Sequence, residues 1–184
     1  MRRYHWFVTA LAAIVLLSSC VTLQKESVDP MELLRQSVLT KAGDPLSIEA
    51  EYLLLYYAAD WCPFCVEFTD QLNEQYRGLK RLYGDSVELI FIGHINDQSD
   101  EELIAYLSDG EHAFGYLPIA LRDQTQVIEK LGEHRFYIPG FVLLDEMGEV
   151  IASSNGESIE EYVRDRPIYV LQGIKRTDCV SCPQ

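Results

Sequence analysis

The stretch YYAADWCPFCVEF, from Tyr56 to Phe68, joins an apolar run to two cysteines that are separated by two residues. Residues 53–58 (LLLYYA) have the length and the continuous apolar character of a strand covered on both faces of a sheet. After the cysteines, apolar side chains recur every three or four residues from Phe64 to Tyr83, which predicts a helix. Cys62 and Cys65 therefore stand where a central strand passes into a helix.

The rest of the chain predicts further strands and helices around this junction. Residues 87–93 (VELIFIG) are typical of a second strand, so residues 51–93 form a β-α-β unit whose two strands are parallel. Other expected elements are a helix over 30–41 begun by Asp29-Pro30, a helix over 99–107, a short strand over 117–121, a helix from 123 that Gly132 ends, a hairpin of 141–145 with 149–153, and a last helix from 158 that Pro167 interrupts.

The position of the two cysteines favours redox chemistry. The unpaired amides and the dipole at a helix N-terminus stabilise a thiolate, which is the reactive form of cysteine. Pro63 fits the first turn, where no backbone donor is missed. Cys62 is then the candidate nucleophile, and Cys65, one turn further, can resolve a mixed disulfide formed on it. A structural disulfide and a metal site remain open as alternatives.

Two motifs carry a family resemblance. Trp61-Cys-Pro-Phe-Cys65 at a strand-to-helix junction, with Ile138-Pro139 ahead of the expected hairpin, resembles the thioredoxin superfamily. The aromatic run before the motif, Phe68-Thr69 after it, and the segment QTQVIEKLGEHRF leading to Ile-Pro are similar to its tryparedoxin/nucleoredoxin-like branch. The resemblance covers about residues 51–153 and implies a thioredoxin-like α/β fold. In such a fold a central mixed sheet is flanked by helices, with a helix and strand inserted between the two motifs.

The resemblance also implies roles for individual residues. Pro139 would form a cis-proline loop that packs against the dithiol and disfavours metal there, and the backbone of Ile138 would pair with an incoming polypeptide. Trp61 would flank the site together with Pro63 and Phe64. The cysteines themselves would carry the two electrons, so no bound cofactor and no metal is expected.

Several positions depart from the family pattern. Phe64 stands where tryparedoxins commonly have a second proline, and Tyr56 stands where thioredoxins have a buried aspartate. The usual proton acceptor is therefore absent or supplied by another residue. Because Asp60 and Glu67 lie near the motif and no cation lies inside it, we expect a reductant or a mid-potential exchanger rather than a strong oxidant.

The histidines carry weaker expectations. His94 follows the second strand at the same sheet edge as Cys62, so a place near the site is one interpretation and a solvated loop is the other. His112 and His134 are expected at the surface.

The N-terminus predicts export and lipidation. Arg2 and Arg3 precede an apolar stretch at residues 6–17 that is too short to span a bilayer, as in a secretory signal. Residues 17–20 (LSSC) resemble the lipobox of bacterial lipoproteins, in which Cys20 would become the lipidated first residue. Val21 fits the sorting pattern of outer-membrane lipoproteins. We expect a signal peptide over 1–19, a lipidated tether over 20–29, a domain over 30–175 and a tail over 176–184.

Charge and cysteine spacing complete the sequence-based picture. The net charge is −14, and it becomes −16 when Arg2 and Arg3 leave with the signal, which disfavours nucleic acid as a partner. Besides Cys20, the cysteines form two Cys-x-x-Cys pairs, and export permits disulfides. The second pair, Cys179 and Cys182, is interpreted as a local disulfide, a second redox pair or a metal-binding pair.

Together these features predict a lipid-anchored thiol-disulfide oxidoreductase of the bacterial envelope, facing the periplasm. Its expected partners are exported proteins with disulfides and a membrane or periplasmic redox protein. Two alternatives remain: a thioredoxin of cytochrome c maturation that reduces apocytochrome cysteines, and a copper-binding metallochaperone of thioredoxin fold.

Overall fold

The computed structural model describes residues 28–131 and 137–178 and contains the predicted β-α-β unit. Strand β1 (Tyr52–Tyr57) leads into helix α3 (Pro63–Tyr83), and a short 3-10 turn, η2 (Gly84–Ser86), connects it to β2 (Val87–Phe91). β1 and β2 pair in parallel register, as the sequence predicts. This unit places the start of α3 at the carboxyl end of β1.

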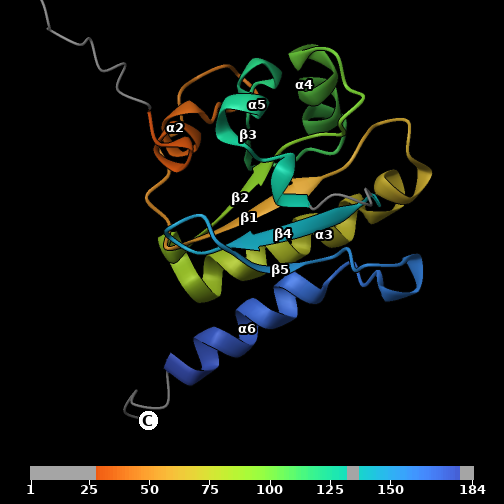
Figure 1. Ribbon diagram of the computed structural model, residues 1–184. Helices are drawn as coiled ribbons and strands as arrows, with labels where there is room; N and C mark the ends of the chain where they lie inside the picture. Colours follow the sequence, from red (N-terminus) through yellow and green to blue (C-terminus); the bar gives the residue numbers. More distant parts are fainter. Residues whose placement is uncertain (1–27, 132–136, 179–184) are drawn as a thin grey trace, which may run out of the picture.

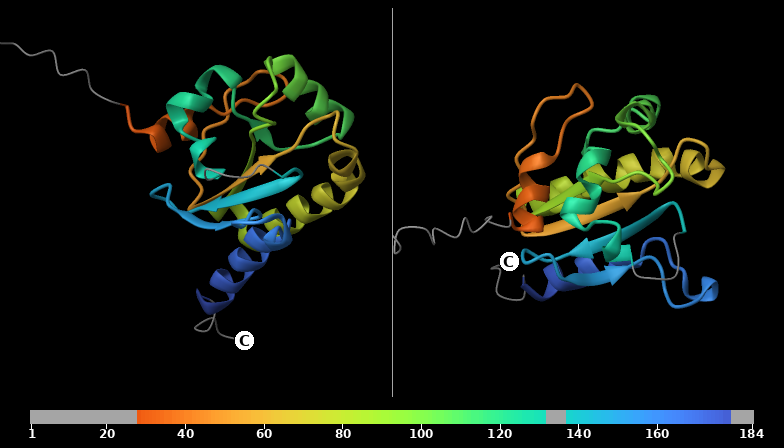
Figure 2. Two further views of the ribbon diagram at one scale, coloured as in Figure 1. Left: turned by 45° about the vertical axis from the view of Figure 1, so that its right-hand side comes forward. Right: turned by 45° about the horizontal axis from the view of Figure 1, so that its top comes forward.

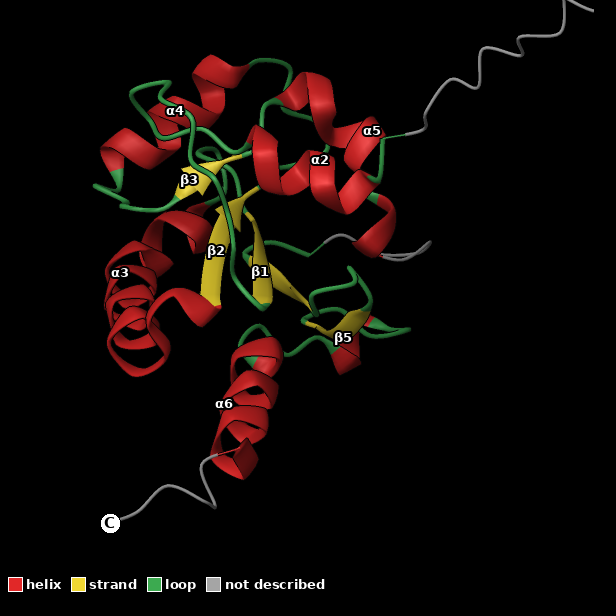
Figure 3. Ribbon diagram, turned by 90° about the vertical axis from the view of Figure 1, so that its left-hand side faces the viewer, coloured by secondary structure: helices red, strands yellow, loops and turns green. Residues whose placement is uncertain are grey.

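One five-stranded mixed sheet forms the centre of the molecule, in the order β3-β2-β1-β4-β5 (Figure 1). β3 (Gly115–Tyr116) is parallel to β2, whereas β4 (Gly140–Leu144) and β5 (Val150–Ser153) form the predicted antiparallel hairpin beside β1. The expected α/β thioredoxin-like fold, with a mixed sheet flanked by helices, is confirmed. Figure 3 shows the helices on either side of the strands.

Side chains alternate along the strands and divide the core into two layers. From β1, Leu54 and Tyr56 point into the layer with α3, α4 (Asp100–Asp109) and α6 (Arg166–Asp178). Leu53, Leu55 and Tyr57 point into the other layer, with α2 (Pro30–Ser37) and the segment around Val127. All five of these β1 side chains are fully buried, as expected for a central strand covered on both faces. α2 begins as predicted, because Asp29 Oδ1 accepts a hydrogen bond from Met31 N, but it ends at Ser37.

The inserted segment between the two motifs differs in detail from the prediction. The expected strand at 117–121 is wrong, because β3 ends at Tyr116 and Pro118 introduces a 3-10 turn, η3 (Ile119–Leu121). Proline lacks the amide that a continued strand would need. The expected helix from 123 is split into α5 (Arg122–Thr125) and η4 (Glu129–Leu131). Gln126 adopts a left-handed conformation between them, and the buried Tyr57 hydroxyl donates to Val127 O at 2.7 Å.

The C-terminal part also corrects one expectation. Residues 159–161 form only a 3-10 turn, η5 (Ile159–Glu161), and α6 begins at Arg166. Pro167 therefore lies in the first turn of the last helix instead of interrupting it, and proline is well suited to that position because the first-turn amides have no intrahelical acceptor. α6 packs Ile168 and Leu171 into the core.

The two ends of the described chain lie away from the start of α3. In Figures 1 and 2, α2 and the far end of α6 lie on the side opposite the junction between β1 and α3. α6 starts next to the end of β5, where Arg166 donates to Ser153 O, and it runs away from that junction. Over residues 28–131 and 137–178, no helix is long and apolar enough to cross a membrane.

His112 is buried in the core, so its expected surface position is wrong. Its ring stacks between Tyr106 and Phe114, and its Nδ1 lies 2.7 Å from Asn73 Oδ1 of α3. Burial, with a smaller effect of Lys41, lowers the pKa of His112 to about 4. The surrounding aromatic side chains hold this ring in the core, whereas the sequence predicts a solvated histidine.

This histidine should make the stability of the fold fall in acid. The unfolded chain binds the proton with the ordinary pKa near 6.5, so the stabilisation is complete above that pH and is lost as the pH falls towards 4. We expect the free energy of unfolding to drop by about 2 to 3 kcal/mol between pH 7 and pH 4 from this group. Urea unfolding of the wild type and of His112→Gln at both pH values isolates the contribution. Equal pH dependence in the two proteins would contradict it.

Candidate active site

The two cysteines sit at the start of α3, in the arrangement expected from their spacing. Cys62 is the N-cap residue and Pro63 occupies the first turn. The amides of Cys65 and Val66 donate to Cys62 O at 3.0 and 3.2 Å, which closes the first turn of the helix. Both thiols are free, so the structure represents the reduced dithiol. Cys62 keeps 5% of its surface exposed whereas Cys65 has none, so Cys62 is the sulfur that a substrate can approach.

A loop from the far end of the sequence packs against this dithiol. The Ile138-Pro139 peptide bond is cis, and the Cys62 thiol donates to Ile138 O at 3.8 Å. Pro139 is buried, and Tyr162 donates its hydroxyl to Pro139 O. The structure therefore brings together the two motifs that the resemblance paired.

Cys65 stays protonated at neutral pH. Burial is the largest cause that raises the pKa of its thiol, followed by the hydrogen bond with the Cys62 side chain, and the charge of Asp97 acts in the same direction. A buried thiol that keeps its proton can donate it to the neighbouring sulfur. The pair is thus asymmetric, with Cys62 towards the surface and Cys65 held inside as the second thiol.

Tyr56 lies beneath the dithiol where thioredoxins have an aspartate. It is fully buried, and its hydroxyl is 2.8 Å from the hydroxyl of Tyr106. Burial raises the pKa of Tyr56, and the neighbouring Tyr106 raises it further, so both hydroxyls remain neutral. Asp97, from the loop after β2, is the carboxylate whose charge acts on Cys65. No sequence pattern marks Asp97 as part of the site, because only the fold brings that loop towards α3.

A groove opens beside the dithiol and the cis-proline loop. Its volume is about 560 Å³, and it lies between the first turns of α3, the cis-proline loop and the segment before α6. Its lining includes Phe64, Phe68, Ile138, Pro139, Tyr162 and Arg164. The guanidinium of Arg164 lies 3.7 Å from the ring centroid of Phe68 and pairs with Asp165. The groove is therefore mostly apolar, and Glu67, Gln71 and Arg164 are the polar side chains in its wall.

Apolar side chains are also exposed around the groove. Trp61 is 59% exposed and Phe64 is 69% exposed, so both flank the dithiol as expected from the motif. Large exposed apolar side chains that gather at one site are typical of a binding surface for another chain. This arrangement suits an extended polypeptide better than a small polar molecule.

His94 is buried, so the interpretation as a solvated loop residue is wrong. Only 8% of its surface is exposed, and its ring contacts Trp61 edge to face with centroids 5.0 Å apart. The sequence placed His94 at the correct sheet edge but could not show that the Trp61 ring would cover it. The other predicted residues Cys20, Val21, His134, Cys179 and Cys182 lie outside the described residues.

Within the described ranges, no group of three or more His, Cys, Asp or Glu side chains is arranged to hold a metal ion. Asp100 instead accepts from Ile119 N at 2.8 Å, which ties the start of α4 to η3.

Comparisons with known proteins agree with this geometry. A family model described as thioredoxin-like matches residues 50–150, which is 101 of the 184 residues. Human nucleoredoxin is 31% identical over 127 residues, covering 65% of this chain and 27% of nucleoredoxin. The chain thus spans about a quarter of the length of the nucleoredoxins that it matches.

Solved structures show the same fold at lower identity. Tryparedoxin from Trypanosoma brucei superposes with a TM-score of 0.51 at 21% identity, covering 81% of this chain and 91% of that one. Thioredoxin from Wuchereria bancrofti superposes with a TM-score of 0.52 at 21% identity, covering 76% of this chain and 94% of that one. The predicted similarity to nucleoredoxin and tryparedoxin is confirmed as a distant one.

Proposed function

The chain belongs to the thioredoxin-like family and is a thiol-disulfide oxidoreductase with a Cys62–Cys65 pair, and from this premise we propose that it exchanges disulfides with exported proteins while anchored to a membrane. The proposal that the substrate is a polypeptide rests on the open apolar groove that adjoins the dithiol and the cis-proline loop. A polypeptide can lie in this groove with its disulfide against Cys62.

The exchange has two balanced steps. The Cys62 thiolate attacks one sulfur of the substrate disulfide, so a mixed disulfide forms and one substrate thiolate leaves. Cys65 then gives up its proton and attacks the Cys62 sulfur, which releases the second substrate thiolate and leaves a Cys62–Cys65 disulfide. The substrate gains two electrons and two protons, and the protein is oxidised by the same amount. A membrane or periplasmic redox protein would return the dithiol to the reduced state.

The direction of electron flow that we propose is reduction of the substrate or exchange at a middle potential. Strong oxidants owe their potential to a stabilised reduced form, in which a thiolate is favoured by nearby positive charge. Here the neighbouring side chains include Asp60 and Glu67, and the buried Cys65 thiol holds its proton. These features supply no such stabilisation.

The membrane anchor is proposed from the N-terminal sequence. Arg2 and Arg3, the apolar stretch and the LSSC segment ending at Cys20 support export and lipidation. The acidic surface, with its net charge of −14, supports attachment through lipid rather than through a basic patch.

Trapping in the cell envelope tests the proposal. In the full chain with Cys65→Ala, the first step can occur but the second cannot, so exported proteins should accumulate as mixed disulfides on Cys62. We expect adducts in the membrane fraction that reductant releases and that mass spectrometry identifies. The double variant Cys62→Ala with Cys65→Ala is the matched control and should form none.

A second variant separates anchoring from chemistry. With residues 1–20 of the trapping variant replaced by a cleavable secretory signal that brings no cysteine, the adducts should move from the membrane fraction to the soluble fraction. Adducts that stay in the membrane would contradict lipidation at Cys20. The absence of any adduct, together with a wild type that is inactive on model disulfides, would overturn the proposed function.

A further inference from the structure

Trp61, a large exposed aromatic side chain beside Cys62, rests against the buried ring of His94. The ring of His94 meets the indole edge to face, with an angle of 88° between the planes and 5.0 Å between the centroids. An aromatic pair of this geometry is favourable beyond the area that it buries. The position of Trp61 next to the dithiol thus depends on where His94 is held.

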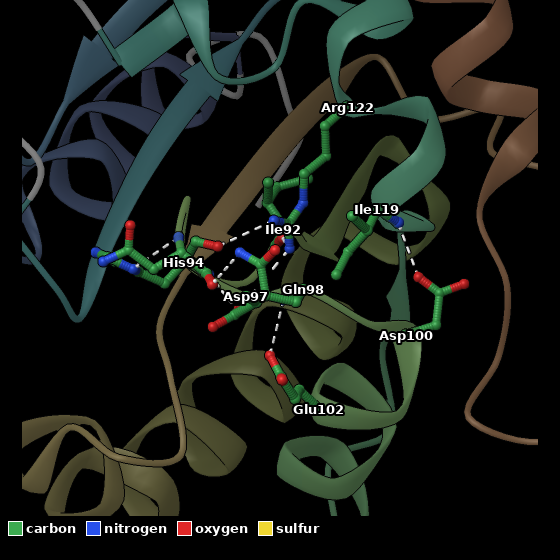
Figure 4. A network of polar contacts seen from close by, with 9 residues as sticks. Ile92, His94, Asp97, Gln98, Asp100, Glu102, Ile119 and Arg122 are labelled. Carbon is green, nitrogen blue, oxygen red and sulfur yellow. Dashed lines mark hydrogen bonds and ion pairs between the residues drawn. The ribbon is translucent and has the colours of Figure 1, made fainter.

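His94 is fixed through both its backbone and its ring (Figure 4). Its amide donates to Asp97 Oδ2 at 2.6 Å, and its carbonyl accepts from Arg122 Nη1 at 2.9 Å. The ring nitrogen Nδ1 accepts from the amide of Asn96 at 3.1 Å. Because Nδ1 is an acceptor here, the neutral ring carries its proton on Nε2.

The side chains that fix His94 are themselves buried. Asp97 and Arg122 are 7% and 5% exposed, and their charged atoms lie 3.9 Å apart. Arg122 also donates to Ile92 O at 2.5 Å, so one guanidinium joins the end of β2 to the loop that follows it. Buried hydrogen bonds and an ion pair of this kind favour one conformation of a loop, although Arg122 Nε has no hydrogen-bond partner among the described residues. The loop after β2 is therefore tied to the end of its strand by several buried contacts.

We propose that His94 is a positioning residue for thiol-disulfide exchange, which holds the Trp61 indole beside Cys62 so that it contacts an incoming protein disulfide. The inference rests on the proposed function, because it concerns how the same site receives a polypeptide. His94 does not touch the reacting sulfur atoms. His94 affects the rate of exchange only through the position of the Trp61 indole.

The same geometry makes the support sensitive to acid. When Nδ1 becomes protonated, it can no longer accept from the Asn96 amide, and two donors then face each other. Burial lowers the pKa of His94, while the charge of Asp97 opposes this effect and that of Arg122 adds to it. Among the described residues these two are the charged groups that act on the ring. The ring is therefore neutral at pH 7, and the contact with Trp61 should loosen as the pH falls below the ordinary histidine value.

Two readouts test the proposal in the full chain. A Trp6→Phe background leaves Trp61 as the sole tryptophan, so its emission reports on the contact directly. We expect His94→Ala to shift this emission and to lower the second-order rate constant for insulin reduction by about 3- to 10-fold. The rate with a small aromatic disulfide, which does not span the indole and the groove, should change by less than about twofold.

His94→Phe is the matched variant, because it keeps a ring against Trp61 and removes the titrating nitrogen. It should restore the insulin rate and the emission at pH 7, and its emission should not change on acidification, unlike that of the wild type. Ile95→Ala, at an exposed neighbouring position outside the network, should behave as the wild type in both readouts.

Three results would overturn the inference. They are an unchanged Trp61 emission in His94→Ala, an equal loss of rate with both disulfides, and a failure of His94→Phe to restore the insulin rate. A wild type that reduces neither disulfide would instead count against the proposed function, and the emission of Trp61 would still decide whether His94 positions it.

Discussion

Replacing Cys62 with serine is expected to lower the rate of insulin reduction by at least about a thousandfold, because a serine hydroxyl cannot replace a thiolate in attack on a disulfide. Cys65→Ser should lose turnover to a similar extent for a different reason. It retains the attacking sulfur of Cys62 but cannot release the mixed disulfide. Single-turnover assays measure both losses as the release of reduced insulin by pre-reduced protein that has been freed of small thiols, because an added thiol would itself release the mixed disulfide.

Mass spectrometry distinguishes the two variants. Cys65→Ser should carry a disulfide-linked substrate on Cys62, whereas Cys62→Ser should carry none. Cys20→Ser is the control for loss of a thiol far from the pair in sequence, and it should keep the wild-type rate. If Cys62→Ser accumulated adducts and Cys65→Ser did not, the assigned roles of the two cysteines would be reversed.

Gly93→Ala is expected to reduce the free energy of unfolding by more than about 3 kcal/mol, which is well above the effect of an ordinary substitution. Gly93 has a φ of +77°, which residues with a side chain rarely adopt. A Cβ atom would also lie 2.5 Å from Asp97 Oδ2 and 2.6 Å from Arg122 Nη2. The substitution would therefore strain the backbone and separate the buried ion pair that holds the loop after β2.

Gly173→Ala provides the matched control for this substitution. Gly173 lies in α6, and a Cβ atom there meets nothing within 4 Å. Alanine should stabilise the helix by about 0.5 to 1 kcal/mol. Urea denaturation of both variants measures the difference, and equal midpoints would show that the loop after β2 tolerates a side chain at position 93.

The fold was predictable from the sequence where local signals agreed. The apolar run of β1, the cysteines and the helical spacing after Phe64 all mark one junction, so the β-α-β unit follows from a short stretch. The pairing of this junction with Pro139 came from resemblance, because nothing local connects residues so far apart. In contrast, α5 is shorter than its sequence suggests, because the buried Tyr57 hydroxyl donates a hydrogen bond to the carbonyl of Val127.

The residues of the site could be predicted from the sequence where they contact near neighbours in the chain. Cys62, Pro63 and Cys65 lie within one helical turn, and the structure places them as expected. The contact between His94 and Trp61 joins two loops that only the folded sheet brings together. The surface position expected for His112 is wrong for the same reason, because the aromatic side chains that cover it come from α4 and from the segment after it.

The direction of α6 has a consequence for how a partner can approach the dithiol. The helix starts near the groove, where Arg164 lies, and its 13 residues extend about 20 Å away from the dithiol. The body of α6 therefore leaves the rim of the groove open, and a protein bound across Cys62 would meet only the first turn of this helix.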